Sequence, residues 1–187
     1  PPTTSRVEPY DGDFDLVTTV MPTPRGELMH QHLAGRKGQP GMTRKHWLAG
    51  RDDALRYLSL PAPEPTGDAG AFFALREQAG ERGIVEVELR DMNPGGHVAE
   101  LFGSEAFALL SIEDRGLLHE LLEHSTRRAL RMVDWLLARG LGPYFAVSGQ
   151  EYIAPPLHGP RDFRDFNVRY DQRIFGRIRD AGGLVHV

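Results

Sequence analysis

The stretch Arg139-Gly-Leu-Gly-Pro-Tyr-Phe-Ala-Val147 decides the fold, because it joins the end of a long helix to a short apolar strand. The helix is expected to start at Ser111-Ile-Glu-Asp114, which resembles a capping box with Asp in place of Glu or Gln, and to end at Gly140. Its apolar residues keep helical spacing: Leu117, Leu118, Leu121, Leu122, Leu130, Val133, Leu136 and Leu137. The sequence therefore predicts a helix that is followed directly by a buried strand over 144–147.

The same order of helix, glycine and apolar strand occurs in two further places. A helical segment over 68–82 leads through Gly83 to a strand over 84–89, and a helix that Pro160 opens leads through Gly182-Gly183 to Leu184-Val-His-Val187. Glycine supplies the left-handed residue that ends a helix. Alternating strands and helices predict a parallel sheet, and the last two strands with the helix between them predict one βαβ unit.

Two parallel folds fit this pattern, a doubly wound open sheet and a (β/α)8 TIM barrel. No Gly-x-Gly-x-x-Gly follows a strand, which weakens the dinucleotide-binding form of the open sheet. A barrel typically takes ~250 residues and rarely fewer than ~200. The 187 residues also end inside an expected strand. We therefore predict a single α/β barrel domain over residues 1–187 that is incomplete in this chain.

The first sixty residues are expected to be largely irregular. Val17–Val20 is compatible with a short strand, but residues 29–46 have few apolar anchors and predict a long loop. Asp52–Leu60 predicts a short helix. The proline-rich Pro61–Pro65 is interpreted as a surface loop within one domain, because neither side of it looks self-sufficient.

The composition excludes several classes of protein. No apolar run approaches the ~20 residues that cross a bilayer, and the arginines are interleaved with acids in a chain of net charge −4, so neither a membrane span nor a nucleic-acid-binding face is predicted. Without cysteine there is no disulfide and no cysteine-based zinc site. The cytoplasm is the expected compartment.

One segment resembles a known family. Gly149-Gln-Glu-Tyr-Ile-Ala-Pro-Pro-Leu-His-Gly-Pro-Arg-Asp-Phe163, taken with Tyr170-Asp171 and Asp180-Ala-Gly-Gly-Leu-Val-His-Val187, resembles the uroporphyrinogen decarboxylase superfamily. In that family a strand ends in a polar loop, a proline-containing element starts a helix, and a glycine-rich turn leads to the next strand. Met21-Pro-Thr-Pro-Arg-Gly-Glu-Leu28 and Arg51-Asp-Asp-Ala-Leu55 are similar to two further elements. The resemblance implies a barrel whose N-terminal and C-terminal parts are missing from this chain.

The superfamily contains true uroporphyrinogen decarboxylases and cobamide-dependent methyltransferases. True decarboxylases have a tyrosine after a Gly-Pro-x-Thr turn, whereas this chain has Asp91-Met-Asn-Pro-Gly-Gly-His97 at that place. The methyltransferases hold zinc with a His-x-Cys-Gly element after the strand that we place at 184–187. The resemblance therefore implies a methyltransferase-like enzyme, with zinc or a corrinoid as a partner of the full-length protein, more than a decarboxylase.

Two loops at expected carboxyl ends of strands supply candidate site residues, because barrel active sites lie at that end. The first loop carries Asp91, Asn93 and His97, although Asn93-Pro-Gly-Gly96 is also an ordinary turn. The second carries Gln150, Glu151 and Tyr152 before Pro155-Pro156, although Glu151 could be a solvated loop carboxylate. We assign catalytic roles to Glu151 and His97, and substrate binding to the other four residues. The metal ligands stay unknown.

Other polar residues have simpler interpretations. Glu86 and Glu88 alternate with apolar residues, which fits a barrel lumen or, more simply, an edge strand with one wet face. His30 and His32 share a face only if their segment is a strand, and they lack acidic or cysteine partners nearby. We interpret His119 and His124 as surface residues, and His186 as a packing residue.

Three functions follow from these observations. The first is a methyltransferase-like enzyme of the superfamily that acts on a small molecule or methyl donor. The second is a true porphyrinogen decarboxylase, which predicts arginines for the substrate carboxylates. The third is a non-catalytic module whose open sheet edges need a partner. A homodimer, or a partner that completes the barrel, is compatible with all three.

Overall fold

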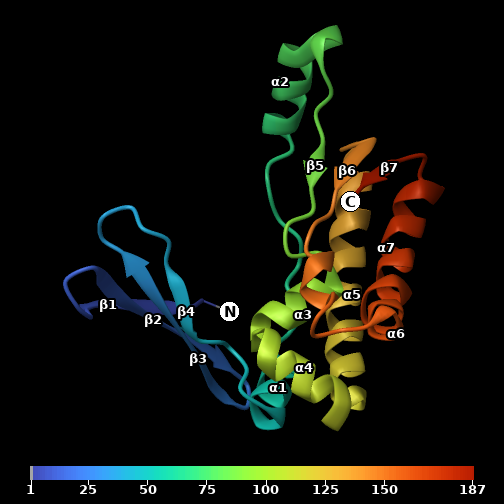
Figure 1. Ribbon diagram of the computed structural model, residues 1–187. Coiled ribbons are helices and arrows are strands. Elements are labelled where there is room, and N and C mark those ends of the chain that lie inside the picture. The colour runs from blue at the N-terminus through green and yellow to red at the C-terminus, as the bar shows by residue number, and fades with distance from the viewer. Residues whose placement is uncertain (1) are drawn as a thin grey trace. The chain divides into compact units, whose positions relative to one another are not determined.

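A computed structural model describes residues 2–187. The chain divides into two compact units, and each is described by itself. The first unit is the chain up to Pro61 together with Glu100–Glu113, and the second is Ala62–Ala99 together with Asp114–Val187. Figure 1 labels the helices and strands of both.

The first unit contains a four-stranded antiparallel sheet in the order β1-β2-β3-β4. Its strands are β1 (Thr4–Pro9), β2 (Phe14–Thr23), β3 (Gly26–Gly35) and β4 (Met42–Lys45). Pro24 and Arg25 form the two-residue turn between β2 and β3, where Gly26 has a φ of 119° and its carbonyl accepts a hydrogen bond from the Thr23 hydroxyl at 2.7 Å. Short turns of this kind fix the register of a hairpin.

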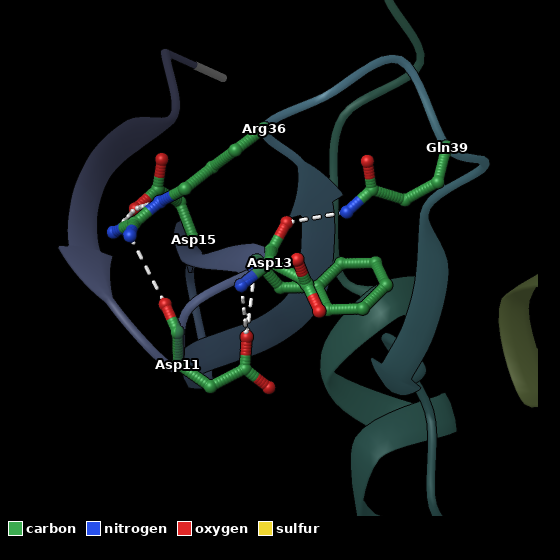
Figure 2. A network of polar contacts seen from close by, with 6 residues as sticks. Asp11, Asp13, Asp15, Arg36 and Gln39 are labelled. Atoms are coloured by element: carbon green, nitrogen blue, oxygen red, sulfur yellow. Dashed lines mark hydrogen bonds and ion pairs between the residues drawn. The ribbon is translucent and has the colours of Figure 1, made fainter.

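A polar network joins the two other turns of this sheet (Figure 2). Arg36 forms an ion pair with Asp15 and donates to the Asp11 carbonyl oxygen at 3.0 Å, while Gln39 donates to the Asp13 carbonyl oxygen at 2.6 Å. Lys37 Nζ lies 2.8 Å from Asp13 Oδ1. The hydrogen bond from Arg36 lowers the pKa of Asp15. Asp11 and Asp13 in the first turn and Asp15 at the start of β2 therefore hold the two turns together.

Two helices complete the first unit, α1 (Arg51–Leu58) and α4 (Ser104–Glu113). α1 contacts β3 and buries Ala54, and α4 buries Phe107. The Leu48 N–H donates to the Leu101 carbonyl oxygen at 3.0 Å, which ties the segment before α1 to the end of α3.

The second unit contains a three-stranded parallel sheet in the order β5-β6-β7, with strands β5 (Val87–Glu88), β6 (Tyr144–Ala146) and β7 (Leu184–His186). Its longer helices are α2 (Gly70–Ala79), α3 (Pro94–Phe102, of which 94–99 belong to this unit), α5 (Arg115–Leu137) and α7 (Arg169–Asp180). Shorter helical segments are η1 (Gly80–Arg82), η2 (Gln150–Ile153), α6 (Pro160–Phe163) and the π-helical η3 (Arg164–Val168).

The core of this unit lies between the sheet and its helices. α5 and α7 pack against each other beside the sheet (Figure 1). One cluster of buried apolar residues, called the core cluster below, is drawn from helices α2, α5 and α7, from β6 and from the loops next to the strands. Its members are Phe72, Leu89, Met92, Ala129, Val133, Leu136, Leu141, Phe145, Val147, Ile174 and Ile178. Val87 and Phe145 on β5 and β6, and Leu89 and Val147 just after these strands, take part in the cluster. Of the alternate residues, Glu86, Glu88 and Ser148 are exposed, and Tyr144 and Ala146 are half-buried. The core cluster therefore lies against one face of the sheet.

Several predictions for the second unit are confirmed. The long helix is present as α5, but it begins later than expected: its N-cap is Asp114, which accepts a hydrogen bond from Leu117 N at 3.1 Å, and Ser111 belongs to α4. β6 and β7 are parallel neighbours, as the βαβ unit requires. Gly140 and Gly182 have the expected left-handed φ, but Gly83 is extended.

The prediction of a (β/α)8 barrel is wrong. The described residues form one antiparallel sheet and one open parallel sheet, and neither closes. A barrel needs a continuous ring of strands with a fixed stagger, and here only β5, β6 and β7 are parallel. Strands and helices alternate along the chain both in open parallel sheets and in barrels, so this alternation does not distinguish the two folds.

The predicted loop over 29–46 is also wrong, because it contains most of β3 and all of β4. The cause is that the strands of this sheet are mostly half-buried or exposed, and therefore lack an apolar alternation. β2 and β3 pair over ten residues each, so backbone hydrogen bonds define these strands where side chains do not.

Candidate functional site at the edge of the parallel sheet

The two loops chosen from the sequence meet at one edge of the parallel sheet. β5 and β6 are adjacent parallel strands, so the loops that follow them emerge at the same edge. The β5 loop leads into α3 through Asn93, and the β6 loop leads into η2 through Gly149 and Gln150. In open α/β sheets, ligands bind outside the carboxyl ends of the strands.

A buried carboxylate on α7 connects the two loops. Asn93 Nδ2 donates to Asp171 Oδ1 at 2.8 Å and to Oδ2 at 2.9 Å, and Gln150 Nε2 donates to Oδ2 at 3.4 Å. Asn93 Oδ1 also accepts from Gly96 N at 2.5 Å, which caps the first turn of α3. The β5 loop, the β6 loop and α7 are therefore held as one arrangement.

Glycines permit the close approach of these loops. A Cβ on Gly96 would lie 2.5 Å from the Gly149 carbonyl oxygen, and a Cβ on Gly95 would lie 1.9 Å from Asn167 Oδ1. Asn167, which is fully buried, donates from Nδ2 to the Gln150 carbonyl oxygen at 3.1 Å. The glycines of Pro94-Gly-Gly96 therefore do more than form a turn, because their lack of side chains leaves space for Asn167 and for the β6 loop.

The electrostatic state of Asp171 is unusual. Burial raises the pKa of Asp171 to about 6, and the amide donors of Gln150 and Asn93 lower it only in part. Asp171 is 5% exposed, and among the described residues no cation contributes to the shift of its pKa. A buried carboxylate without a cation is costly in its charged form, so Asp171 holds a proton much more readily than an ordinary aspartate.

His97 lies in the first turn of α3, where its backbone N–H donates to the Asn93 carbonyl oxygen at 3.0 Å. Burial, the nearby Arg128 guanidinium and His124 lower the pKa of His97 to about 4, against the opposing effect of Asp91. The imidazole is therefore neutral at pH 7. The groups that act on the His97 imidazole are thus different from those that hold Asp171.

Glu151 and Tyr152 are exposed and lie outside the buried network. The Glu151 carboxylate accepts a hydrogen bond from Gly149 N at 3.1 Å, and the Tyr152 side chain is 39% exposed. Glu151 is therefore available to solvent at the sheet edge. Of the six predicted residues, the structure brings Asn93 and Gln150 together through Asp171, and places Asp91 near His97.

Asp91 adopts a left-handed conformation with a φ of 58° and is the one non-glycine residue with positive φ among residues 2–187. Left-handed backbone is unfavourable for residues with a Cβ. We expect Asp91→Gly to raise the free energy of unfolding by up to about 1 kcal/mol, as measured by urea unfolding. Asp52→Gly, at the start of α1, is the control and should lower it. A destabilised Asp91→Gly protein would show that the carboxylate outweighs the strain.

Asp171 lies in a segment that resembles the superfamily, but the sequence predicted no role for it. A signal was present, because Asp171 precedes the buried Ile174 and Ile178 by three and seven residues and so lies on the apolar face of its helix. An acid on such a face needs a polar partner. The partner Asn93 is 78 residues away in the sequence, which conceals the pair.

The remaining candidates have structural roles. Glu86 precedes the edge strand β5, Glu88 lies in it, and both are exposed. His186 Nδ1 lies 3.7 Å from Glu86 Oε2. The prediction that His186 is a packing residue is wrong, because this residue is exposed. His30 stacks on Trp47 with ring centroids 5.2 Å apart. His119, predicted to be a surface residue, is half-buried and its Nδ1 lies 2.7 Å from the Tyr170 hydroxyl.

Across residues 2–187 there is no group of three or more His, Cys, Asp or Glu side chains that could hold a metal ion. None of the helices in that range is long and apolar enough for a bilayer span. Comparisons with family models, with curated proteins and with solved structures each gave no match. The resemblance to the uroporphyrinogen decarboxylase superfamily therefore stays a prediction.

Proposed function

We propose that this chain carries part of the active site of a small-molecule enzyme that resembles the uroporphyrinogen decarboxylase superfamily, and that its activity is methyltransferase-like. The observation that supports the proposal is the network in which Asp171 ties Asn93 and Gln150 together at the carboxyl edge of β5 and β6. Two polar loops held rigidly at such an edge are what a substrate-positioning site requires.

The residues divide into two roles. Asp171 is a positioning residue, since it is buried and holds both loops through amide donors. Glu151 is the exposed carboxylate on the second loop, and we assign it contact with substrate as a proton acceptor. Its hydrogen bond from Gly149 N ties the direction of the Glu151 side chain to the loop that Gln150 and Asp171 hold.

The zinc ion implied by the resemblance does not fit the described residues. A zinc ion needs at least three protein ligands, and residues 2–187 provide no such group. The described residues therefore supply no zinc-bound thiolate, and methylcobalamin enters the proposal as a substrate. What these residues can do is orient a substrate and accept a proton, which a transfer to a thiol or hydroxyl acceptor needs.

The test is an assay for methyl transfer from free methylcobalamin to 2-mercaptoethanol at pH 7.5, followed by the loss of methylcobalamin absorbance. We expect turnover by the purified protein, and a reduction of at least about tenfold in kcat for Glu151→Gln. Glu113→Gln, an exposed residue at the end of α4, is the control and should keep full activity.

Asp171→Ala separates positioning from chemistry. We expect it to raise KM more than it lowers kcat, because it removes the carboxylate that holds the two loops and does not remove the Glu151 carboxylate. Formation of coproporphyrinogen from uroporphyrinogen would decide for the decarboxylase instead. A protein that turns over neither substrate, or a Glu151→Gln variant with full activity, would overturn the proposal.

A further inference from the structure

Strand β1 is an exposed edge of the antiparallel sheet. All six of its residues, Thr4–Pro9, are exposed, and Val7 is 64% exposed. Within the described residues, β1 is hydrogen-bonded to β2 and has no strand on its other side. An edge of this kind presents unpaired backbone N–H and C=O groups that can pair with another chain.

The alternation of an antiparallel pair shows which residues present those groups. The Tyr10 N–H donates to the Phe14 carbonyl oxygen at 3.1 Å, so the backbone groups of Tyr10 point toward β2. Hydrogen-bonded and outward-facing residues alternate along a strand, and therefore Glu8 and Arg6 also bond to β2. Val7 and Ser5 direct their N–H and C=O groups away from the sheet.

The sequence of β1 is complementary to itself in the antiparallel direction. When two copies of Thr4-Ser-Arg-Val-Glu-Pro9 pair about Val7, Val7 lies opposite Val7, and each Arg6 lies opposite a Glu8. Directly opposite residues of opposite charge stabilise an antiparallel pair, and like charges destabilise it. Val7 then exchanges both backbone hydrogen bonds with its symmetry copy, as the outward direction of its groups allows.

We propose that β1 pairs with β1 of a second copy of this chain, about a two-fold axis at Val7, so that the two antiparallel sheets become continuous. Charged residues usually protect an edge strand from pairing. Here Arg6 Nε lies 3.4 Å from Glu8 Oε2 of the same strand, and the two side chains are 70% and 50% exposed. Each side chain can therefore exchange its partner in the same strand for the oppositely charged residue of the second copy.

The dimer is expected to be weak. Pairing of two six-residue strands buries an area well below the roughly 1,200 Å² of stable interfaces, and Pro9 has no N–H to donate. We therefore expect dissociation in the micromolar range, measured by sedimentation velocity of the intact protein between about 5 and 500 µM at low salt.

The decisive experiment is a charge exchange. Arg6→Glu alone and Glu8→Arg alone each place like charges opposite each other, and each should weaken the dimer at least about tenfold. An equimolar mixture of the two variants restores opposite charges at both positions and should form a heterodimer. Arg25→Glu, in the exposed turn between β2 and β3, makes the same charge change away from β1 and should not affect dimerisation.

Val7→Pro provides a second measurement that does not depend on charge. The Val7 N–H points away from β2, so proline at this position removes a hydrogen bond of the dimer and leaves β1–β2 pairing intact. We expect a folded monomer with an unchanged thermal midpoint. A wild-type protein that stays monomeric up to 500 µM, or variants that dimerise like the wild type, would overturn the proposal.

Discussion

Replacing Asp171 with asparagine is expected to stabilise the protein at pH 8 by up to about 3 kcal/mol, and to give no gain below pH 4. The expected gain follows from the difference between a pKa of about 6 in the folded protein and 3.8 for an ordinary aspartate, since one pH unit corresponds to about 1.4 kcal/mol. Asparagine keeps an oxygen that can accept the hydrogen bond from Asn93 Nδ2.

The direction of the pH dependence follows from proton binding. Between pH 3.8 and about 6 the folded state binds more protons at Asp171 than the unfolded state does, so stability falls as the pH rises through this range. The cost is complete above about pH 6 and absent below about pH 4. The difference in unfolding free energy between Asp171→Asn and wild type should therefore grow over this window.

The measurement is urea unfolding at pH 4, 5, 6 and 8, followed by the fluorescence of Trp135 in a Trp47→Phe background. Trp135 packs against the core of the second unit, so its signal reports on the unit that contains Asp171. A stability difference that is the same at every pH would contradict the protonation argument.

Asp162→Asn is the matched control with the opposite sign. Asp162 Oδ1 lies 2.9 Å from Arg115 Nη1. Burial raises the pKa of Asp162, but the hydrogen bond and charge of Arg115, together with the Gly159 backbone and His158, lower it overall. Its contribution to stability is present above the ordinary pKa and is lost as the pH falls through the folded pKa. Asp162→Asn should therefore destabilise the protein at pH 8.

The second large effect is expected for Phe145→Ala. Phe145 is fully buried on β6, the central strand of the parallel sheet, and belongs to the core cluster. Removing a buried phenylalanine side chain costs about 3–5 kcal/mol, which includes the cavity that remains. Because natural domains are stable by only about 5–15 kcal/mol, this loss is a large part of the total.

The same Trp135 fluorescence during urea unfolding measures this effect at pH 7. Leu184→Ala on β7 is the control, because Leu184 is 60% exposed and its truncation should change the unfolding free energy by less than about 0.5 kcal/mol. A loss below about 1 kcal/mol for Phe145→Ala would mean that β6 is not the centre of a packed core.

Helices of the second unit were predictable because their signal is local. In α5 the apolar residues recur with helical spacing, and Leu117, Leu118, Leu121 and Leu122 are buried as expected. The backbone hydrogen bonds of a helix join residues four apart, so a short stretch of sequence predicts both the helix and the face that it buries. The candidate loops were found for the same reason, since polar residues directly follow apolar strands.

The antiparallel sheet was not predictable in this way. β1 is exposed along its whole length, and β3 carries His30, Gln31 and His32, which gives no apolar alternation. A strand is stabilised by hydrogen bonds to a partner strand, and the identity of that partner depends on turns and on tertiary structure. The barrel prediction was wrong for a similar reason, because closure of a sheet depends on how strands that are distant in the sequence pair with one another.

The sequence by itself determined the alternation of helix, glycine and apolar strand around 139–147, and the polar loops that carry Asn93 and Gln150. Both depend on neighbours within a few residues. Tertiary structure alone decided that the parallel strands form an open sheet and that Asp171 joins the two loops from 78 and 21 residues away. The physical reason is that burial of a carboxylate, like the closure of a sheet, depends on which distant segments meet.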